Sequence, residues 1–373
     1  MDELDVEKPL IGAEEREMLV KCLVDGSLSQ GKYVFRFEKE FAELCGVKYG
    51  CAVMNGTAAL HLALLALNLK PGDEVLVPSM TFIASANPIV FCGATPVFVD
   101  SLKDTWCIDP KDAARKITPK TKGIIAVHLY GNACDMQAIQ EIASSNGLWI
   151  IEDCAESHGT LYNGKPVGSF SDISFFSFYR NKHITTGEGG MCLTNSAQAL
   201  ERMRLLRSQG KPKTEDLSDD DFVNKQFVSE EVGYNYRMTD LQAAVGLAQM
   251  SRLQQFLEIR IRYAKIYFDA LGGSNNVVLP WHDGKNVCHT YWGVPVLVND
   301  VKTKVRVITE FRRSGIRLRP FFFPCHMQKI FGDVVDDCPV AEDLNDRGVV
   351  LPNAQSLEEK DIQRISETFR QLL

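Results

Sequence analysis

Short apolar runs that alternate with helical patterns constrain the fold of this 373-residue chain more than any other feature. Runs that are buried on both faces and separated by helices indicate a largely parallel α/β sheet. The predicted strands are residues 74–78, 95–100, 123–131, 148–155, 172–179 and 189–195. The predicted helices are residues 57–69, 81–92, 135–145 and 196–207, and Asn195 is the expected N-cap of the last one.

The last third of the chain has a different pattern. Residues 211–230 are charged and poor in aliphatic side chains, which predicts a surface loop. Thr239 and Gln242 form a capping-box pattern that opens a long helix, expected to end at about residue 271. Further on we expect a strand at 290–298 and helices at 301–315 and 357–373. These patterns predict a large domain at residues 1–250 and a smaller α+β domain at residues 251–373.

Composition excludes several classes of protein. Apolar residues make up 45% of the chain and charged residues 24%, which argues against disorder. A net charge of −7 argues against a nucleic-acid partner. The acidic N-terminus has no secretory signal, and the longest apolar stretch, residues 58–69, is too short to span a membrane. None of the 11 cysteines forms a C-x-x-C pair, so we expect a cytoplasmic protein with reduced thiols and no metal site.

A single lysine, Lys182, lies in the turn between the strands predicted at 172–179 and 189–195. Enzymes with α/β sheets place their catalytic groups at the carboxyl ends of strands, and a lysine amine can form an imine with a carbonyl group. Taken alone, Lys182 is more simply a surface residue beside a turn.

Acidic residues, including Asp153 and Glu156, follow the strand predicted at 148–155. An aspartate in this place can pair with a pyridinium nitrogen, which is the main electronic control that a protein exerts on pyridoxal phosphate (PLP). Taken alone, helix capping is the simpler role for Asp153.

Gly56 and Thr57 form a turn that opens an apolar helix. Backbone N–H groups at a helix N-terminus can bind a phosphate, although such turns also serve as plain helix caps. Together, a phosphate cradle, an aspartate and a lysine, each at a strand–helix junction and in this chain order, predict a PLP-dependent enzyme of fold type I.

The sequence resembles the DegT/DnrJ family of nucleotide-sugar aminotransferases over nearly its whole length. The resemblance implies a fold-type I architecture, in which helices flank a mainly parallel mixed sheet and a smaller α+β domain follows. The motifs that carry it include NGTAALHLALLAL (55–67), IEDCAESHG (151–159), FSFYRNKHITTGEGGM (176–191), GYNYRMTDLQAAVGLAQ (233–249) and RPFFFPCH (319–326).

The resemblance implies roles for individual residues. Lys182 matches the lysine that bonds to PLP and transfers the proton, and Asp153 matches the aspartate that pairs with the ring nitrogen. The other implied cofactor contacts are Gly56, Thr57, Ala58 and Ser177 at the phosphate, Phe82 and Ala155 on the ring faces, Glu156 near the ring 3-oxygen, and Asn235 at the phosphate of the neighbouring subunit. The active site is then shared across a homodimer.

The resemblance also implies the substrates. L-Glutamate is the expected donor and converts PLP to pyridoxamine phosphate (PMP). The expected acceptor is GDP-4-keto-6-deoxymannose, aminated at C4, in polysaccharide biosynthesis; dTDP or UDP acceptors and amination at C3 are the alternatives. Arg237, Arg319 and His326 lie in segments that line the substrate side, where arginine suits a diphosphate, and structural ion pairs are the alternative for them.

Two positions depart from the family pattern. One branch carries histidine in place of the lysine and removes a 3-hydroxyl, but here the motif places Lys182 in that position and His183 one residue later. Glu156 stands where glutamine is common, and its charge favours a protonated lysine–cofactor bond. Remote alternatives are a sugar dehydratase, a non-catalytic regulator, and a desulfurase, which would need Cys325 as a mobile nucleophile.

Overall fold

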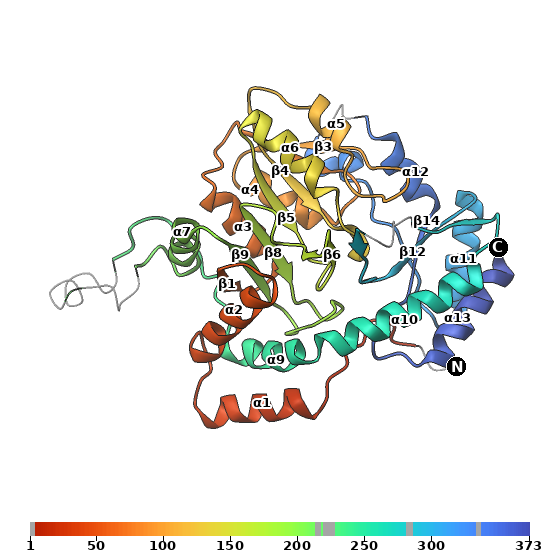
Figure 1. Ribbon diagram of the computed structural model, residues 1–373, viewed down its shortest axis with the longest axis horizontal. Coiled ribbons are helices and arrows are strands. Elements are labelled where there is room, and N and C mark those ends of the chain that lie inside the picture. The colour runs from red at the N-terminus through yellow and green to blue at the C-terminus, as the bar shows by residue number, and fades with distance from the viewer. Residues whose placement is uncertain (1–3, 213–217, 219–227, 281–285, 333–336) are drawn as a thin grey trace.

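The computed structural model describes residues 4–212, 218, 228–280, 286–332 and 337–373. A seven-stranded sheet of order β1-β9-β8-β5-β4-β2-β3 forms its centre (Figure 1). The strands from β8 to β3 are parallel, whereas β9 runs antiparallel to both β8 and β1. The strands are β1 (Tyr49–Val53), β2 (Glu74–Pro78), β3 (Thr95–Val99), β4 (Thr121–Val127), β5 (Trp149–Asp153), β8 (Ile173–Ser177) and β9 (Gly190–Thr194).

These strands confirm the predicted fold class. Each of the six predicted strands is present, and the sequence patterns missed only β1 among the strands of this sheet. The strand predicted at 123–131 ends at Val127, because Tyr130 adopts a φ of 55° inside a short 3-10 turn.

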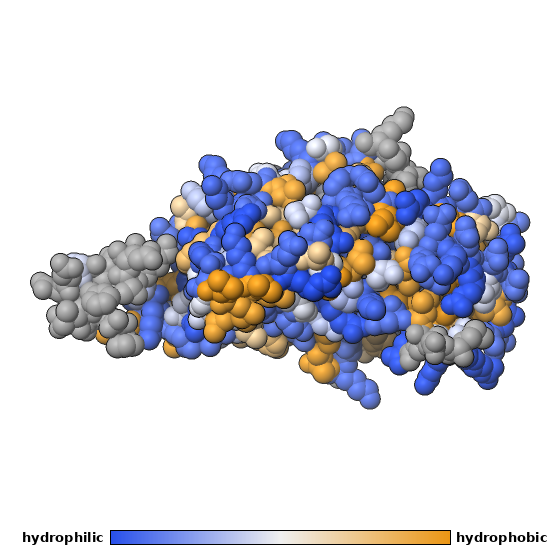
Figure 2. All heavy atoms as spheres, turned by 90° about the horizontal axis from the view of Figure 1, so that it is seen from below, coloured by the Kyte–Doolittle hydropathy of each residue, from blue (hydrophilic) through white to orange (hydrophobic). Residues whose placement is uncertain are grey.

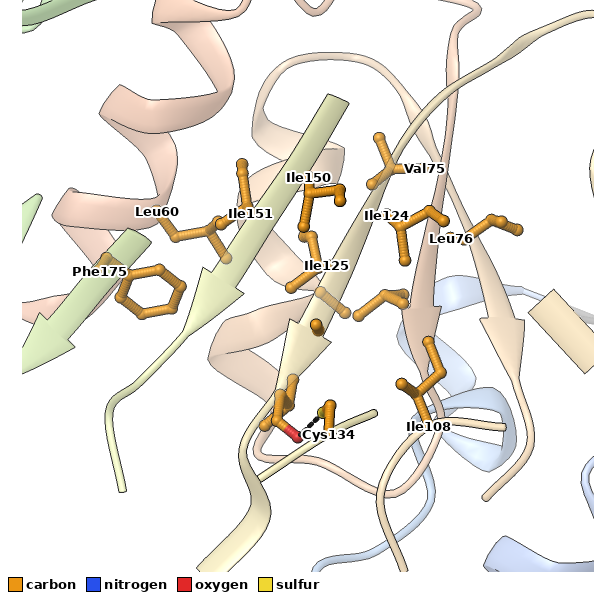
Figure 3. Close-up of a cluster of buried hydrophobic side chains, with 14 of the residues drawn as sticks. Leu60, Val75, Leu76, Ile108, Ile124, Ile125, Cys134, Ile150, Ile151 and Phe175 are labelled. Carbon is orange, nitrogen blue, oxygen red and sulfur yellow. Dashed lines mark hydrogen bonds between the residues drawn. The ribbon is translucent and has the colours of Figure 1, made fainter. Parts of the chain in front are cut away.

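Neighbouring side chains of the sheet point into two separate cores. Phe175 of β8 joins the cluster around α3 (Gly56–Ala66), and Phe176 joins the cluster on the opposite face. Figure 3 shows the first cluster, in which Leu60 of α3 lies near Ile151 of β5 and Phe175. This alternation is the period-2 pattern of a sheet covered on both faces.

The helices that cover the sheet differ in detail from the predicted ones. The helix predicted at 81–92 is instead η1 (Ile83–Ser85) followed by α4 (Asn87–Phe91), because Pro88 has no N–H to continue a helix from the preceding turn and is tolerated only in the first turn of α4. The N-cap of α7 (Ala197–Arg207) is Ser196 and not the predicted Asn195, whose side chain accepts a hydrogen bond from the Lys48 amide. Also present are α1 (Ala13–Val24), α2 (Lys32–Leu44), α5 (Pro110–Arg115) and α6 (Met136–Asn146).

The long helix predicted from residue 240 is two helices. Its capping box at Thr239 and Gln242 is confirmed, but α9 (Asp240–Ser251) ends before α10 (Leu253–Leu271), and Arg252 between them has φ −106° and ψ 1°. The two helices lie end to end along one side of the molecule (Figure 1). The first half of α10 packs against the large sheet and its second half packs in the C-terminal core.

An antiparallel sheet of order β10-β12-β14-β13 forms the C-terminal part. Its core lies between the sheet and the helices α10, α11 and α13. The division at residue 250 stays a prediction, and the loop predicted at 211–230 lies largely outside the described residues. The remaining elements are β10 (Val277–Val278), β12 (Val294–Val298), α11 (Val301–Arg313), β13 (Arg319–Pro320), α12 (Pro339–Arg347), β14 (Gly348–Leu351), α13 (Glu359–Leu372), and a small sheet of β6 (Leu161–Tyr162), β7 (Lys165–Pro166) and β11 (Val287–Cys288).

The surface is mixed in character. Apolar patches interrupt the mostly hydrophilic face in Figure 2, and the exposed Val20, Leu23 and Val24 at the end of α1 add to this apolar surface. Within the described part of the chain, no helix is long and apolar enough to cross a bilayer.

Candidate active site

Three chain segments that carry predicted site residues meet at one edge of the large sheet. β5 ends at Asp153, β8 ends at Ser177, and β1, which runs in the same direction as β8, leads into α3 at Gly56. The carboxyl ends of these strands therefore bring together residues that are far apart in the sequence, as predicted.

Lys182 lies in the turn after β8, and its side chain is only 12% exposed. Its Nζ lies 3.5 Å from Oε1 of Glu156 and 4.6 Å from the centroid of the Trp292 ring. Burial lowers the pKa of the Lys182 amine, while the negative charges of Glu156 and Asp153 oppose this shift. A buried amine with a lowered pKa is suited to nucleophilic and base chemistry.

Asp153 is buried at the end of β5. Its Oδ2 accepts a hydrogen bond of 2.7 Å from the Ser85 hydroxyl, and its Oδ1 accepts one of 3.0 Å from the Ala155 amide. Burial raises the pKa of the carboxyl, and these hydrogen bonds oppose the shift. The carboxylate is thus fixed in orientation and gains stability from a nearby cation.

Glu156 is also buried, and its Oε2 accepts a 3.1 Å hydrogen bond from the Tyr130 amide. Burial raises the pKa of this carboxyl, and the neighbouring Lys182 is the main charge that opposes the shift. Glu156 therefore lies between Lys182 and the turn that follows β4.

The start of α3 forms a narrow cradle beside β8. Asn55 caps the helix by accepting from the Ala58 amide at 2.8 Å, so Ala58 donates within the helix cap. The amides of Gly56 and Thr57 belong to the first turn, where helix amides have no intrahelical acceptor. A Cβ atom on Gly56 would lie 3.1 Å from Cβ of Ser177, so glycine keeps the space between these segments open.

The predicted ring-stacking residues flank the same region. The amide of Ala155 binds Asp153, and Phe82 lies just before η1, the turn that supplies Ser85. The Phe82 side chain is 57% exposed, and its ring centroid lies 5.8 Å from that of Phe322. An exposed aromatic face beside buried charged groups is consistent with a flat ligand in this region.

The remaining predicted residues lie around this centre. Asn235 is exposed and its main chain pairs with Ser208, and the main chain of Arg237 pairs with Val53 at the end of β1. Arg319 lies on β13, with its guanidinium carbon 5.0 Å from the centroid of the Trp292 ring.

His326 is engaged by hydrogen bonds. Its Nδ1 lies 2.6 Å from the Ser79 hydroxyl and its Nε2 lies 3.2 Å from Oε1 of Glu342. Both ring nitrogens therefore have protein partners.

Three contacts of the site were not predicted from the sequence. Ser85 orients Asp153, the Tyr130 amide orients Glu156, and Trp292 packs against Lys182. The indole N–H of Trp292 donates to the carbonyl of Asn181 at 3.0 Å. The buried guanidinium of Arg260 donates to the Trp292 carbonyl at 2.8 Å. Burial lowers the pKa of Arg260 to about 9. Ser85 lies inside the helix predicted at 81–92, and no local pattern singled it out.

The residues of two remote alternatives lie in unsuitable places. His183 is buried, and its Nε2 donates to the Thr290 carbonyl at 3.2 Å, so it is Lys182 that faces Glu156 and Asp153. Cys325 is buried, its thiol donates to the Thr81 carbonyl, and burial raises its pKa to about 12. This thiol is not a mobile nucleophile.

His128, Glu152 and Cys154 form the one group of potential metal ligands found among the described residues. Glu152 accepts from His128, from the amides of Gly168 and Phe170, and from a serine hydroxyl. We interpret this buried network as structural, because hydrogen bonds already satisfy its carboxylate.

The model of the DegT/DnrJ/EryC1/StrS aminotransferase family matches residues 9–370. The chain belongs to this family. It is 42% identical to the GDP-perosamine synthase of Escherichia coli O157:H7 over 372 residues, which cover 100% of this chain and 99% of the relative. It is 41% identical to the GDP-perosamine synthase of Caulobacter vibrioides, with 99% of this chain and 98% of that protein covered.

Solved structures of sugar aminotransferases share the fold. The aminotransferase from Psychrobacter cryohalolentis superposes with a TM-score of 0.91 at 32% identity, with 98% of each chain covered. The Streptococcus pneumoniae protein Spr1654, solved in PMP and PLP forms, superposes with TM-scores of 0.92 and 0.91 at 26% identity, covering 99% of this chain and 97–98% of that one. The protein is therefore a PLP-dependent sugar aminotransferase.

The residues at the sheet edge fit this cofactor. Lys182 offers a buried amine of lowered pKa, and Asp153 offers a buried carboxylate for a protonated ring nitrogen. Gly56 and Thr57 form the N-terminus of α3, Gly56 packs closely against Ser177, and the free amides of such a terminus suit a phosphate.

Proposed function

We propose that the protein transfers the amino group of L-glutamate to C4 of GDP-4-keto-6-deoxymannose and so forms GDP-perosamine. The observation that carries this proposal is the full-length similarity to enzymes named for that product, together with a lysine–aspartate site at the expected sheet edge. We place the reaction in the cytoplasm, because its substrates are small charged metabolites.

Lys182 has two tasks in this proposal. Its amine would hold PLP when the cofactor is bound, and as a free base it would move the proton released at Cα of the amino donor. An amine accepts a proton only when it is neutral, and burial shifts the Lys182 amine in that direction. PLP, when bound, supplies the conjugated ring that takes up the electron pair released at Cα.

Asp153 tunes the cofactor from the other end of the site. Its carboxylate, which the Ser85 hydroxyl and Ala155 amide keep in place, would accept a hydrogen bond from the protonated ring nitrogen of the cofactor. A charge-assisted hydrogen bond in a buried site is stronger than one in water, so this pairing would favour the protonated form of the ring. Phe82 and Ala155 would cover the two faces of the ring.

We assign the substrate side of the site to the region around Arg319, on the other side of Trp292 from Lys182. Among the predicted substrate residues, Arg319 shares with Lys182 a contact to the Trp292 ring. His326 has protein partners on both nitrogens and is better suited to shape the wall than to contact the substrate. Arg237, whose main chain pairs with Val53 shortly before the phosphate cradle, keeps its proposed role as a substrate-binding residue.

We propose a homodimer that shares its active sites. Asn235, assigned to the phosphate of the neighbouring subunit, is exposed. Apolar side chains linked to its segment are exposed as well: Val232 is 85% exposed, Met54, whose amide binds the Tyr236 carbonyl, is 38% exposed, and Phe91, which packs against the Tyr236 partner His61, is 57% exposed. Such a surface next to a site that needs one more residue fits contact with a second copy of the chain.

The test compares acceptors with [15N]glutamate as donor. We expect kcat/KM to be highest for GDP-4-keto-6-deoxymannose and the 15N label to appear at C4 of the sugar in NMR spectra of the product. A preference for dTDP- or UDP-4-keto-6-deoxyglucose, or a label at C3, would contradict the proposed substrate while leaving the aminotransferase assignment intact.

A further inference from the structure

A pocket beside Lys182 has a strongly basic lining. It lies between the N-terminal segment, the turn that carries Lys182, and the edge of the C-terminal sheet. Among its described lining residues, Glu7 is the only acidic one, whereas the basic ones are Lys8, Arg180, Lys182, Arg260, Arg317 and Arg319. Such a lining selects for an anion.

Glu7 forms ion pairs with two of the basic side chains that line this pocket, Arg319 and Arg180. Its Oε1 accepts from Nε of Arg319 at 2.7 Å and also from Nη2 of Arg319, and its Oε2 lies 3.7 Å from Nη2 of Arg180. Two donors of Arg319 thus converge on one carboxylate oxygen while Arg180 faces the other, and the same donors can bind an oxygen of a substrate carboxylate or phosphate.

The occupied arginine is close to the reacting lysine. The guanidinium carbon of Arg319 lies 5.0 Å from the Trp292 ring centroid, and Nζ of Lys182 lies 4.6 Å from the same centroid. An anion that replaced the Glu7 carboxylate on Arg319 would therefore be held beside the amine that bonds to the cofactor.

The contact is built so that Glu7 can leave without unfolding the segment around it. The Leu4 amide binds the Gly315 carbonyl, and the Lys8 carbonyl accepts from Ser356, so the main chain is fixed on both sides of Glu7. The side chains of Glu7 and Arg319 are 30% and 34% exposed, and ion pairs with this much exposure are weak. A rotation of the Glu7 side chain is enough to free the guanidinium.

We propose that Arg319 and Arg180 form an anion subsite next to Lys182, and that Glu7 is its built-in counter-ion, displaced by a carboxylate or phosphate group of a substrate. The inference rests on the proposed function, which supplies two anionic groups: the carboxylates of L-glutamate and the diphosphate of the nucleotide sugar. Glu7 thus weakens substrate binding and prevents Arg319 from holding other anions.

The experiment measures two constants in the Glu7→Gln variant. One is the KM of L-glutamate in the donor half-reaction, which is followed by the visible absorbance of the PLP enzyme. The other is the Kd of GDP, measured by calorimetry. Removing an exposed counter-ion should lower one of these constants about 2- to 5-fold. A lower KM alone identifies the donor carboxylate as the displacing group, and a lower Kd alone identifies the diphosphate.

Matched variants show whether the effect passes through Arg319. Glu14→Gln removes the same charge from an exposed carboxylate that pairs with Arg252, and neither residue lines this pocket, so it should leave both constants within about 1.5-fold. Arg319→Ala should raise the affected constant about tenfold or more, and adding Glu7→Gln to it should change nothing further.

Two results would overturn the inference. One is that Glu7→Gln leaves both constants unchanged or raises them. The other is that it lowers them equally in the Arg319→Ala background. Neither measurement uses GDP-4-keto-6-deoxymannose, so a wrong acceptor does not affect the test: if GDP does not bind, dTDP and UDP take its place in the same titration.

Discussion

The amine of Lys182 lies 3.5 Å from Oε1 of Glu156, and the two side chains are only 12% and 8% exposed. Burial lowers the pKa of the amine and raises the pKa of the carboxyl, so it pushes both groups toward their neutral forms. Their mutual attraction works in the opposite direction. Glu156 therefore sets how much of the lysine is neutral before the cofactor binds.

Glu156→Gln should lower the pKa of Lys182, because the variant removes the negative charge that most strongly raises it. Only the neutral amine bonds to PLP, so the rate of PLP incorporation into the apoprotein rises with pH through this pKa. We expect the midpoint of that pH profile to move to lower pH in the variant. Glu40→Gln, which loses an exposed carboxylate of α2, should leave the midpoint in place, and an upward shift in Glu156→Gln would contradict the account.

Lys182→Ala should abolish turnover, with a loss of at least about 10²- to 10⁴-fold, while the fold persists. Burial penalises the charged lysine, so the variant should have an unchanged or higher Tm by calorimetry. Lys165→Ala is the control, because Lys165 is exposed on β7. Substantial activity in Lys182→Ala would refute the catalytic assignment.

Asp153→Asn should weaken PLP binding about 10- to 100-fold and lower kcat as well, because a neutral amide cannot hold the ring nitrogen in its protonated form. The amide oxygen can still accept from Ser85, so little stability should be lost. Calorimetric titration of the apoprotein with PLP measures the first effect and steady-state kinetics the second. Wild-type values of both would rule out the pairing with the ring nitrogen.

His158 should make the protein sensitive to acid. It is buried among Phe41, Phe176 and Phe178, and burial lowers its pKa from 6.5 to about 3. Between these two values the unfolded chain binds a proton that the folded protein does not, so stability falls as the pH drops below about 6.5.

The substitution His158→Phe removes the titrating imidazole and places another aromatic ring among Phe41, Phe176 and Phe178. In urea titrations between pH 7 and pH 4, the free energy of unfolding of the variant should fall less steeply, by about 1.4 kcal/mol per pH unit. Equal slopes in the two proteins would contradict this prediction, because they would mean that His158 binds its proton equally well in the folded and unfolded states.

Much of the site was predictable because its main residues lie at strand ends. Asp153, Ser177 and Gly56 each stand next to an apolar strand or helix that the sequence patterns reveal, and parallel strands bring such ends to one edge. Local sequence was therefore enough to place the centre of the site, with the resemblance giving each residue a role.

The supporting contacts were not predictable from local patterns. Ser85 lies in a segment predicted as one helix, but it belongs to the separate turn η1, from which its hydroxyl donates to Asp153. Trp292 reaches Lys182 from the C-terminal third, and Glu7 reaches Arg319 across 312 residues of sequence. Such pairings depend on how the two cores pack against each other, which hydrophobic periodicity does not encode.

The most direct test of the central claim is the visible absorbance of the PLP-loaded protein through one complete cycle. Addition of L-glutamate should bleach the band of the bound cofactor, and GDP-4-keto-6-deoxymannose, added after the glutamate has been removed, should restore it. An enzyme that binds PLP but keeps its band unchanged in glutamate would contradict the proposed transamination.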